Sequence, residues 1–143
     1  MAGPTLIYQD DALRIYWHEA ERYYLSEWQP IFRKGEALKR AYQACLDAAR
    51  ARRGAVWLAD ASKMVVIDQS DQPWISQWFF PEFVKAGARY QASVVPGREV
   101  GKMSAFKAVE RAQVVGALTI SVHKTRADAE AAIRDWHEKH PKD

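Results

Sequence analysis

Cysteine and long apolar runs are what this sequence has least of. Cys45 is its single cysteine, which excludes an internal disulfide and a cysteine-based zinc site. No run approaches the ~18 apolar residues of a membrane span, and no apolar segment near the start leads into the small residues of a secretion signal. We therefore expect a cytoplasmic protein with no membrane span.

The sequence also has little excess of one charge over the other. The formal net charge is +3, and Lys and Arg are interleaved with Asp and Glu along the chain. A nucleic-acid-binding protein more often gathers its basic residues into one stripe, between aromatic side chains that stack on bases. The pattern is typical of solvated helix faces and predicts no nucleic-acid partner.

Recognisable active-site motifs are also missing. The sequence has no Gly-x-Ser-x-Gly nucleophile elbow, no zinc-protease motif and no Walker phosphate loop. His137 and His140 lie close together near the end of the chain, but nothing nearby in sequence completes the set of ligands that a metal site needs. We predict a non-enzymatic protein with no metal and no cofactor.

Aromatic side chains, by contrast, are plentiful, with six Trp, six Tyr and five Phe. Each buries on the order of 150–250 Å², so a few of them fill much of a small core. The length of 143 residues lies within the usual ~100–200 residues of one domain, and no linker or repeat interrupts it. We expect a single domain over residues 1–143.

The hydrophobic pattern alternates between strands and helices. A period of two, as in Leu13, Ile15 and Trp17, predicts half-buried strands, and apolar residues three and four apart predict amphipathic helices. The predicted strands cover residues 5–9, 13–18, 23–28, 55–59, 89–95 and 118–122, and the predicted helices cover 34–53, 73–86, 102–112 and a last segment capped by Thr125.

This alternation indicates parallel strands joined by crossover helices, after an antiparallel opening. We expect an α/β fold with a mixed, mostly parallel central sheet of about five to six strands and about four helices. Trp57 lies in a continuous apolar strand, and Trp136 extends the apolar stripe of the last helix. Both are therefore predicted to be core residues.

The loop that follows the fourth predicted strand is the first candidate site. The strand ends at Asp60, and a polar loop then leads to a helix that begins near Ser70. In open α/β sheets, ligand and switch sites gather at the carboxyl ends of parallel strands. The residues of this candidate switch or partner surface are Asp60, Ser62, Lys63, Asp68, Ser70 and Asp71.

The order of features around this loop resembles the STAS-like family, which includes the bacterial anti-sigma factor antagonists, and particularly a small bacterial branch of it. In that branch a strand ending in Asp precedes a Trp-bearing helix, a Gly and a strand that reads Ala-x-Val-x-Pro. The matching features here are Asp60, Trp74, Trp78, Gly87 and the segment Ala92-Ser93-Val94-Val95-Pro96. The resemblance covers most of the chain in element order. It implies helices mainly on one face of a sheet of four or five strands, and a regulatory role.

In anti-sigma factor antagonists a Ser that opens the helix is phosphorylated, and the charge breaks the partner complex. The resemblance assigns that place to Ser70 in Asp68-Gln69-Ser70. Asp71 departs from the family pattern, because a small residue or Gly is expected there and a fixed negative charge repels a phosphate. Ser70 is then either a switch or only a cap for the helix N-terminus.

The aromatic face of the helix predicted over 73–86 is the second candidate site. Its members are Trp74, Trp78, Phe79, Phe80 and Phe83. Phe79 and Phe80 are adjacent and point in different directions on a helix, so one of them is expected to be exposed or to line a cleft. Pro81 is expected to break or kink the helix. The face is a core, a pocket for an apolar ligand or a self-association surface.

Two functions remain open from the sequence. The first is a non-enzymatic regulatory or sensing module that acts through a protein partner or by self-association as a dimer. The alternative is a binder or carrier of a small apolar ligand that uses the aromatic helix 73–86.

Overall fold

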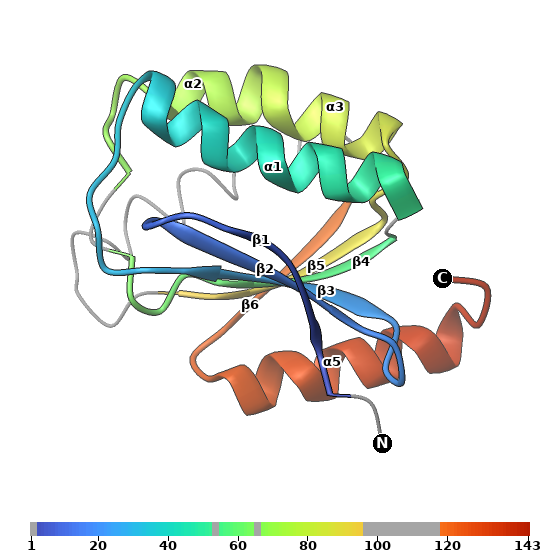
Figure 1. Cartoon of the computed structure of the whole chain (residues 1–143). Coiled ribbons are helices and arrows are strands. Elements are labelled where there is room, and N and C mark those ends of the chain that lie inside the picture. The colour runs from blue at the N-terminus through green and yellow to red at the C-terminus, as the bar shows by residue number, and fades with distance from the viewer. Residues whose placement is uncertain (1–2, 53–54, 65–66, 96–117) are drawn as a thin grey trace.

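A six-stranded sheet forms the centre of the molecule. The computed structural model describes residues 3–52, 55–64, 67–95 and 118–143 (Figure 1). The strands lie in the order of the chain, β1-β2-β3-β4-β5-β6. Their bounds are Thr5–Gln9 for β1, Leu13–His18 for β2, Tyr23–Trp28 for β3, Val56–Asp60 for β4, Tyr90–Val94 for β5 and Thr119–His123 for β6.

The first three strands form an antiparallel meander, and β3, β4, β5 and β6 are parallel. The predicted mixed, mostly parallel sheet of an α/β fold is thus confirmed. Asp10 makes the first tight turn, because its carboxylate accepts hydrogen bonds from the backbone N–H groups of Ala12 (2.7 Å) and Leu13 (2.8 Å). This Asx-type turn performs the task that an Asn-Gly pair performs in other hairpins.

Three helical segments pack on the sheet in the described part of the chain. They are α1 (Glu36–Arg52), a continuous segment made of α2 (Gln72–Trp74), the π-helical turn η1 (Ile75–Phe79) and α3 (Phe80–Lys85), and the C-terminal α5 (Arg126–Lys139). The first two lie on one face of the sheet, the α1 side, and α5 covers the opposite face, the α5 side (Figure 1). The fourth helix predicted from the sequence, over 102–112, lies outside the described residues.

Pro81 neither breaks nor ends its helix. The N–H of Phe80 donates to the carbonyl of Ile75, five residues back, so the turn before Pro81 is a wide π-helical one. Such a turn absorbs the local disturbance that a proline ring causes in the backbone ladder. The predicted irregularity is real, but it takes the form of a π-bulge within a continuous helix. The helix ends before Gly87, whose φ of 115° is readily adopted only by glycine.

Each face of the sheet carries its own hydrophobic cluster. Trp57 is 1% exposed on the α1 side, which confirms it as a core residue. Trp136 packs against the cluster of the α5 side but is only half-buried, so it is not the core residue that the sequence predicted. Its ring stacks on Tyr90 at 4.6 Å, and its indole N–H donates to the Asp143 carboxylate, which keeps it at the rim. No helix in the described residues is long and apolar enough to span a membrane.

Candidate functional site

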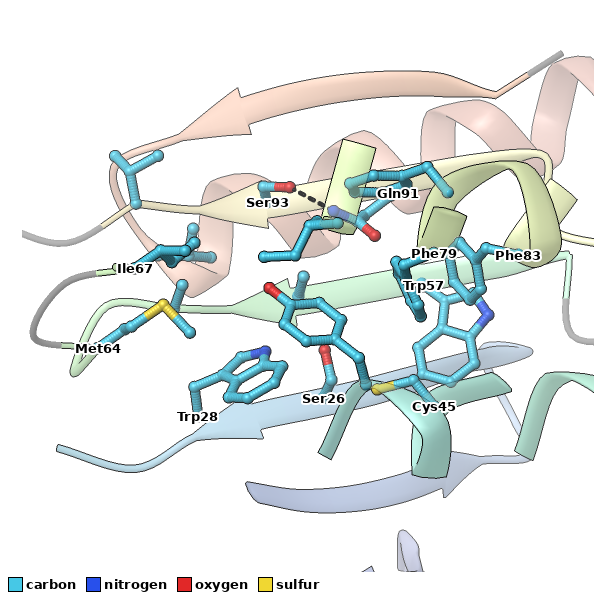
Figure 2. A pocket seen from close by; sticks show the side chains of 17 residues that line it. Ser26, Trp28, Cys45, Trp57, Met64, Ile67, Phe79, Phe83, Gln91 and Ser93 are labelled. Carbon is cyan, nitrogen blue, oxygen red and sulfur yellow. Dashed lines mark hydrogen bonds between the residues drawn. The ribbon is translucent and has the colours of Figure 1, made fainter. Parts of the chain in front are cut away.

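A cavity lies between the sheet and the helices of the α1 side (Figure 2). Its floor is a row of small side chains on three neighbouring parallel strands. Ser26 on β3 is opposite Ala59 on β4, and Ala59 is opposite Ser93 on β5. Neighbouring strands are ~4.8 Å apart, so this row extends about twice that distance without a large side chain. The strand register alone therefore opens a space above the sheet.

Aromatic side chains form the walls of the cavity, from the strands, from α1 and from the η1–α3 segment. They are Trp28, Tyr42, Trp57, Phe79, Phe80 and Phe83. The ring of Phe79 packs edge-on against Tyr42 at 4.7 Å and stacks on Phe83 at 5.1 Å. These contacts fix the wall, because offset-stacked and edge-to-face pairs are the favoured ring geometries. Met64 and Ile67, from the loop after β4, line the opposite end (Figure 2).

The cavity is large enough for more than one water molecule. The space open to the centre of a water-sized sphere is ≈ 70 Å³, several times the ~10–15 Å³ that holds one water. Ligand pockets are typically apolar with a few polar groups that orient the ligand. The cavity has this composition, and its volume lies below the ~300–1,000 Å³ of most ligand pockets.

The polar groups of the cavity lie on its floor and on its α1 wall, where the Tyr42 hydroxyl has no hydrogen bond to another described residue. Gln91 donates a hydrogen bond to the Ser93 hydroxyl at 3.0 Å (Figure 2). Ser26 is 3% exposed, and its hydroxyl has no hydrogen-bond partner among the described residues. Figure 2 shows this hydroxyl pointing toward the inside of the cavity. Ser26 thus offers an unused donor and acceptor to whatever occupies the space.

No ionised group is found among the lining residues that the structure describes. Burial raises the pKa of the Cys45 thiol, with a smaller contribution from Asp10, so the thiol stays protonated. Burial likewise raises the pKa of Tyr42, with smaller contributions from Cys45 and Asp71. The described lining of the cavity is therefore uncharged over the whole neutral pH range.

Three of the predicted aromatic residues line the cavity, namely Phe79, Phe80 and Phe83, which are 3%, 4% and 1% exposed. Phe79 and Phe80 thus both lie against the cavity, and neither is exposed. They lie at the junction of the π-turn and α3, and both face the broad space between α1 and the sheet. Trp78 is the exposed member at 41%, and it stacks on the half-buried Trp74 at 5.0 Å.

The loop residues predicted from the sequence form two separate groups. Asp60 points to the α5 side, where its carboxylate accepts hydrogen bonds from Arg126 (Nε 3.0 Å, Nη2 2.8 Å) and from the Ser62 hydroxyl (2.6 Å). Arg126 also bonds Glu27 at 2.8 Å. Burial alone would raise the pKa of Asp60, but Ser62 and Arg126 outweigh it and lower the pKa. Asp60 therefore ties the start of α5 to the sheet, and Lys63 is exposed beside this group.

The second group lies at the start of α2. The exposed Ser70 hydroxyl donates to the Asp68 carboxylate and does not cap the helix. Asp71 stands at the N-cap position but makes no side-chain cap bond, because its buried carboxylate accepts from the backbone N–H of Gly35 instead. The interpretation of Ser70 as a helix cap is therefore wrong. The bonds to Asp68 and Gly35 replace the cap that the sequence pattern suggested.

Sequence inspection missed a Ser–His pair on β6. The hydroxyl of Ser121 lies 2.7 Å from His123 Nε2 and 2.5 Å from the hydroxyl of Tyr90. Nucleophilic catalysis also needs a third group that orients the base. Within the described residues, His123 Nδ1 has no such partner. A serine and a histidine two positions apart on one strand share a face, and this spacing was the signal available in the sequence.

No group of three or more His, Cys, Asp or Glu side chains in the described residues is placed to hold a metal ion. Comparison of the chain with family models, with curated proteins and with solved structures finds no match. The STAS-like resemblance therefore remains a prediction, as do the regulatory role and the absence of enzymatic activity. The fold and the cavity together define an α/β domain with an uncharged, aromatic-walled space beside its sheet.

Proposed function

We propose that this chain binds a small, largely apolar molecule in the cavity between its sheet and the helix 72–85. The observation that supports the proposal is the cavity itself, with its aromatic walls and its floor of small residues. The chain then serves as a carrier or a sensor, in which the aromatic helix forms the ligand-contacting wall.

An empty space of this kind has a free-energy cost. Protein cores are close-packed, and a void in a core costs about 24 cal/mol for each Å³. For a fully enclosed space of ≈ 70 Å³ this corresponds to roughly 2 kcal/mol, which is the upper bound for a cavity that is partly open to solvent. A ligand that fills the cavity regains that free energy, which gives the empty protein a physical reason to bind one.

The second candidate function is binding of a protein partner or a second copy of the chain. The observation that favours it is the exposed Trp78, whose ring stacks on Trp74 at the outer face of the same helix. Trp is enriched at protein interfaces. A ligand in the cavity contacts Phe79, the neighbour of Trp78, so both functions are compatible in one sensing module.

Filling the cavity from its floor tests the first proposal. Ala59→Leu places a larger side chain in the space, and Ala131→Leu, on the exposed outer surface of α5, is the matched control. We expect one-ring compounds such as toluene and indole to raise the Tm of the parent protein and of Ala131→Leu, because a ligand that binds only the folded state stabilises it. Ala59→Leu should not respond to them.

Urea denaturation of Ala59→Leu without ligand shows whether the variant is folded. Because the new side chain enters empty space, we expect its free energy of unfolding to stay within about 1.5 kcal/mol of the parent. Equal Tm responses of the parent and Ala59→Leu, or no response of either to any compound, would overturn the proposal.

A further inference from the structure

We infer that the ligand of the cavity is an uncharged one-ring aromatic molecule with a hydroxyl or carbonyl oxygen that hydrogen-bonds to Ser26. The inference rests on the proposed function and names the chemical class that the cavity selects. Three features of the molecule support it: the unpartnered hydroxyl on the floor, the absence of charge among the lining residues that the structure describes, and the arrangement of the aromatic rings.

Ser26 is the first feature. Its side chain is almost fully buried, and its hydroxyl has no partner among the described residues. The hydroxyl oxygen itself is reached from the space of the cavity, and a polar group in such a place is normally paired with protein, water or ligand. In β3 it lies between Leu25 and Glu27, which both point to the α5 side, so the Ser26 side chain points to the cavity. An oxygen of the ligand is the partner that this hydroxyl lacks.

Ser93 is in a different state, although it belongs to the same row. Its hydroxyl already accepts a hydrogen bond from Gln91 at 3.0 Å. Ser93 and Ser26 are two strands apart, on either side of Ala59, so a single ligand oxygen cannot reach both of them. The oxygen of the ligand is therefore directed away from β5 and toward β3 and α1, where the Ser26 and Tyr42 hydroxyls have no hydrogen bond to another described residue.

The lining residues in the described part of the chain offer no opposite charge to an ionised ligand. Two carboxylates close to the lining, Asp60 beside Ala59 and Asp71 near Tyr42, are bonded elsewhere, to Arg126 and to the Gly35 N–H. A charged ligand would lose its hydration without gaining an opposite charge, which is strongly unfavourable. A neutral molecule with a single polar atom avoids this loss.

The walls favour a flat ring. Tyr42, Phe79 and Phe83 already pack against one another in edge-on and stacked geometry. An additional aromatic ring finds both kinds of ring contact in the same space. Phenol therefore represents the inferred class, toluene represents its apolar counterpart of equal shape, and benzoate represents a charged ring.

The experiment compares these three compounds on the parent protein and on Ser26→Ala, with dissociation constants from NMR titration. Ser26→Ala should weaken phenol binding by about five-fold or more, the worth of one net hydrogen bond. Toluene binding should change by less than about two-fold. Because each compound is compared with itself on two proteins, differences in hydration between phenol and toluene cancel. Ser121→Ala, on the α5 side, is the control and should change neither constant.

The outcomes distinguish failure of the inferred ligand class from failure of the cavity as a ligand site. If toluene and phenol both bind and Ser26→Ala changes them equally, the role of Ser26 is overturned while the cavity remains a ligand site. Benzoate binding as tight as phenol binding would overturn the uncharged class. If none of the compounds binds the parent protein, the cavity holds only water, and the proposed function fails together with this inference.

Discussion

Ser26 and Glu27 are neighbours on β3, and Ala59 and Asp60 are neighbours on β4, yet the members of each pair meet opposite environments. Ser26 and Ala59 line an uncharged space with aromatic walls on the α1 side. Glu27 and Asp60 are bound by one guanidinium on the α5 side. Successive strand residues point to opposite faces, so a shift of one position separates a ligand-sized space from an ionic cluster.

The two sides also differ in what their polar groups contact. On the α5 side, Tyr90, Ser121 and His123 form a continuous hydrogen-bonded series. Single ring nitrogens of His18 and His137 are the buried side-chain atoms without a partner in the described residues, and both residues lie near one end of this side. On the α5 side, Arg126 fixes the last helix to the sheet, whereas the α1 side contains the cavity and the Ser26 hydroxyl, which is unpartnered among the described residues. Both sides contribute to stability, and the α1 side is the one on which we propose ligand binding.

Removing the indole of Trp57 tests the larger of the two cores. We expect Trp57→Ala to lower the free energy of unfolding by ~3–5 kcal/mol, as in other fully buried large-to-small substitutions. Trp136→Ala should cost about 1–2 kcal/mol, because the half-buried ring gives up less area. Urea denaturation of both variants measures the two values. Equal losses would mean that the rim of the α5 side contributes as much as the aromatic core.

Removing the guanidinium of Arg126 tests the ionic cluster. Loss of one partner from a fully buried ion pair costs ~3–5 kcal/mol. The Arg126 side chain is 41% exposed, so we expect Arg126→Ala to cost about 1–3 kcal/mol. Arg134→Ala, which removes an exposed pair with Glu21, is the matched control and should cost at most ~1 kcal/mol. A loss no larger than that of the control would show that the cluster contributes little to the stability of the α5 side.

Acid should remove the contribution of the same cluster. The hydrogen bond from Arg126 is the main cause that lowers the pKa of Glu27, and Ser62 and Arg126 lower that of Asp60. Carboxyls with lowered pKa in the folded state stabilise it above their ordinary values of 4.5 and 3.8, and this stabilisation is lost as the pH falls through the folded pKa. The difference in unfolding free energy between parent and Arg126→Ala should therefore shrink to under ~1 kcal/mol at low pH. Urea denaturation from pH 7 down to about pH 2 measures it, and a difference that stays unchanged over this whole range would contradict the linkage.

The smallest expected change in stability comes from removing the hydroxyls at the starts of α5 and α2. Thr125 caps α5 by accepting from the N–H of Asp128 at 3.1 Å, so Thr125→Ala should cost ~1 kcal/mol. Ser70 is exposed and caps nothing, so Ser70→Ala should stay within ~0.5 kcal/mol of the parent. Thermal or urea denaturation distinguishes them. A loss at Ser70 as large as that at Thr125 would restore the cap interpretation for the α1 side.

The fold was largely predictable because periodicity is a local signal. The alternation of Leu13, Ile15 and Trp17 and the helical spacing in α1 each depend on a few neighbouring residues. The cavity was not predictable, because Ser26, Ala59 and Ser93 form a row only once the strand register is known. The sequence pointed to one wall, the aromatic helix, but not to the floor.

The ion pair of Asp60 was not predicted either, because its partners lie far away along the chain. Its partner Arg126 follows 66 positions later, and Glu27 is 99 positions from Arg126. In sequence, Asp60 looks like the start of a functional loop. In the fold, Asp60 binds Arg126 at the start of α5, and no local sequence pattern connects these two residues.

The strand order has a consequence for the route by which the chain folds. Every strand pairs with the strand that precedes it in the chain, so the sheet can grow from β1 toward β6 without waiting for distant segments. The bonds of Arg126 to Glu27 and Asp60 join the end of the chain to much earlier strands, and such non-local closures carry the largest loop entropy. We expect α5 to dock after the rate-limiting step. Arg126→Ala should then accelerate unfolding and leave the refolding rate nearly unchanged, and stopped-flow kinetics in urea distinguish this from early docking, which would slow refolding instead.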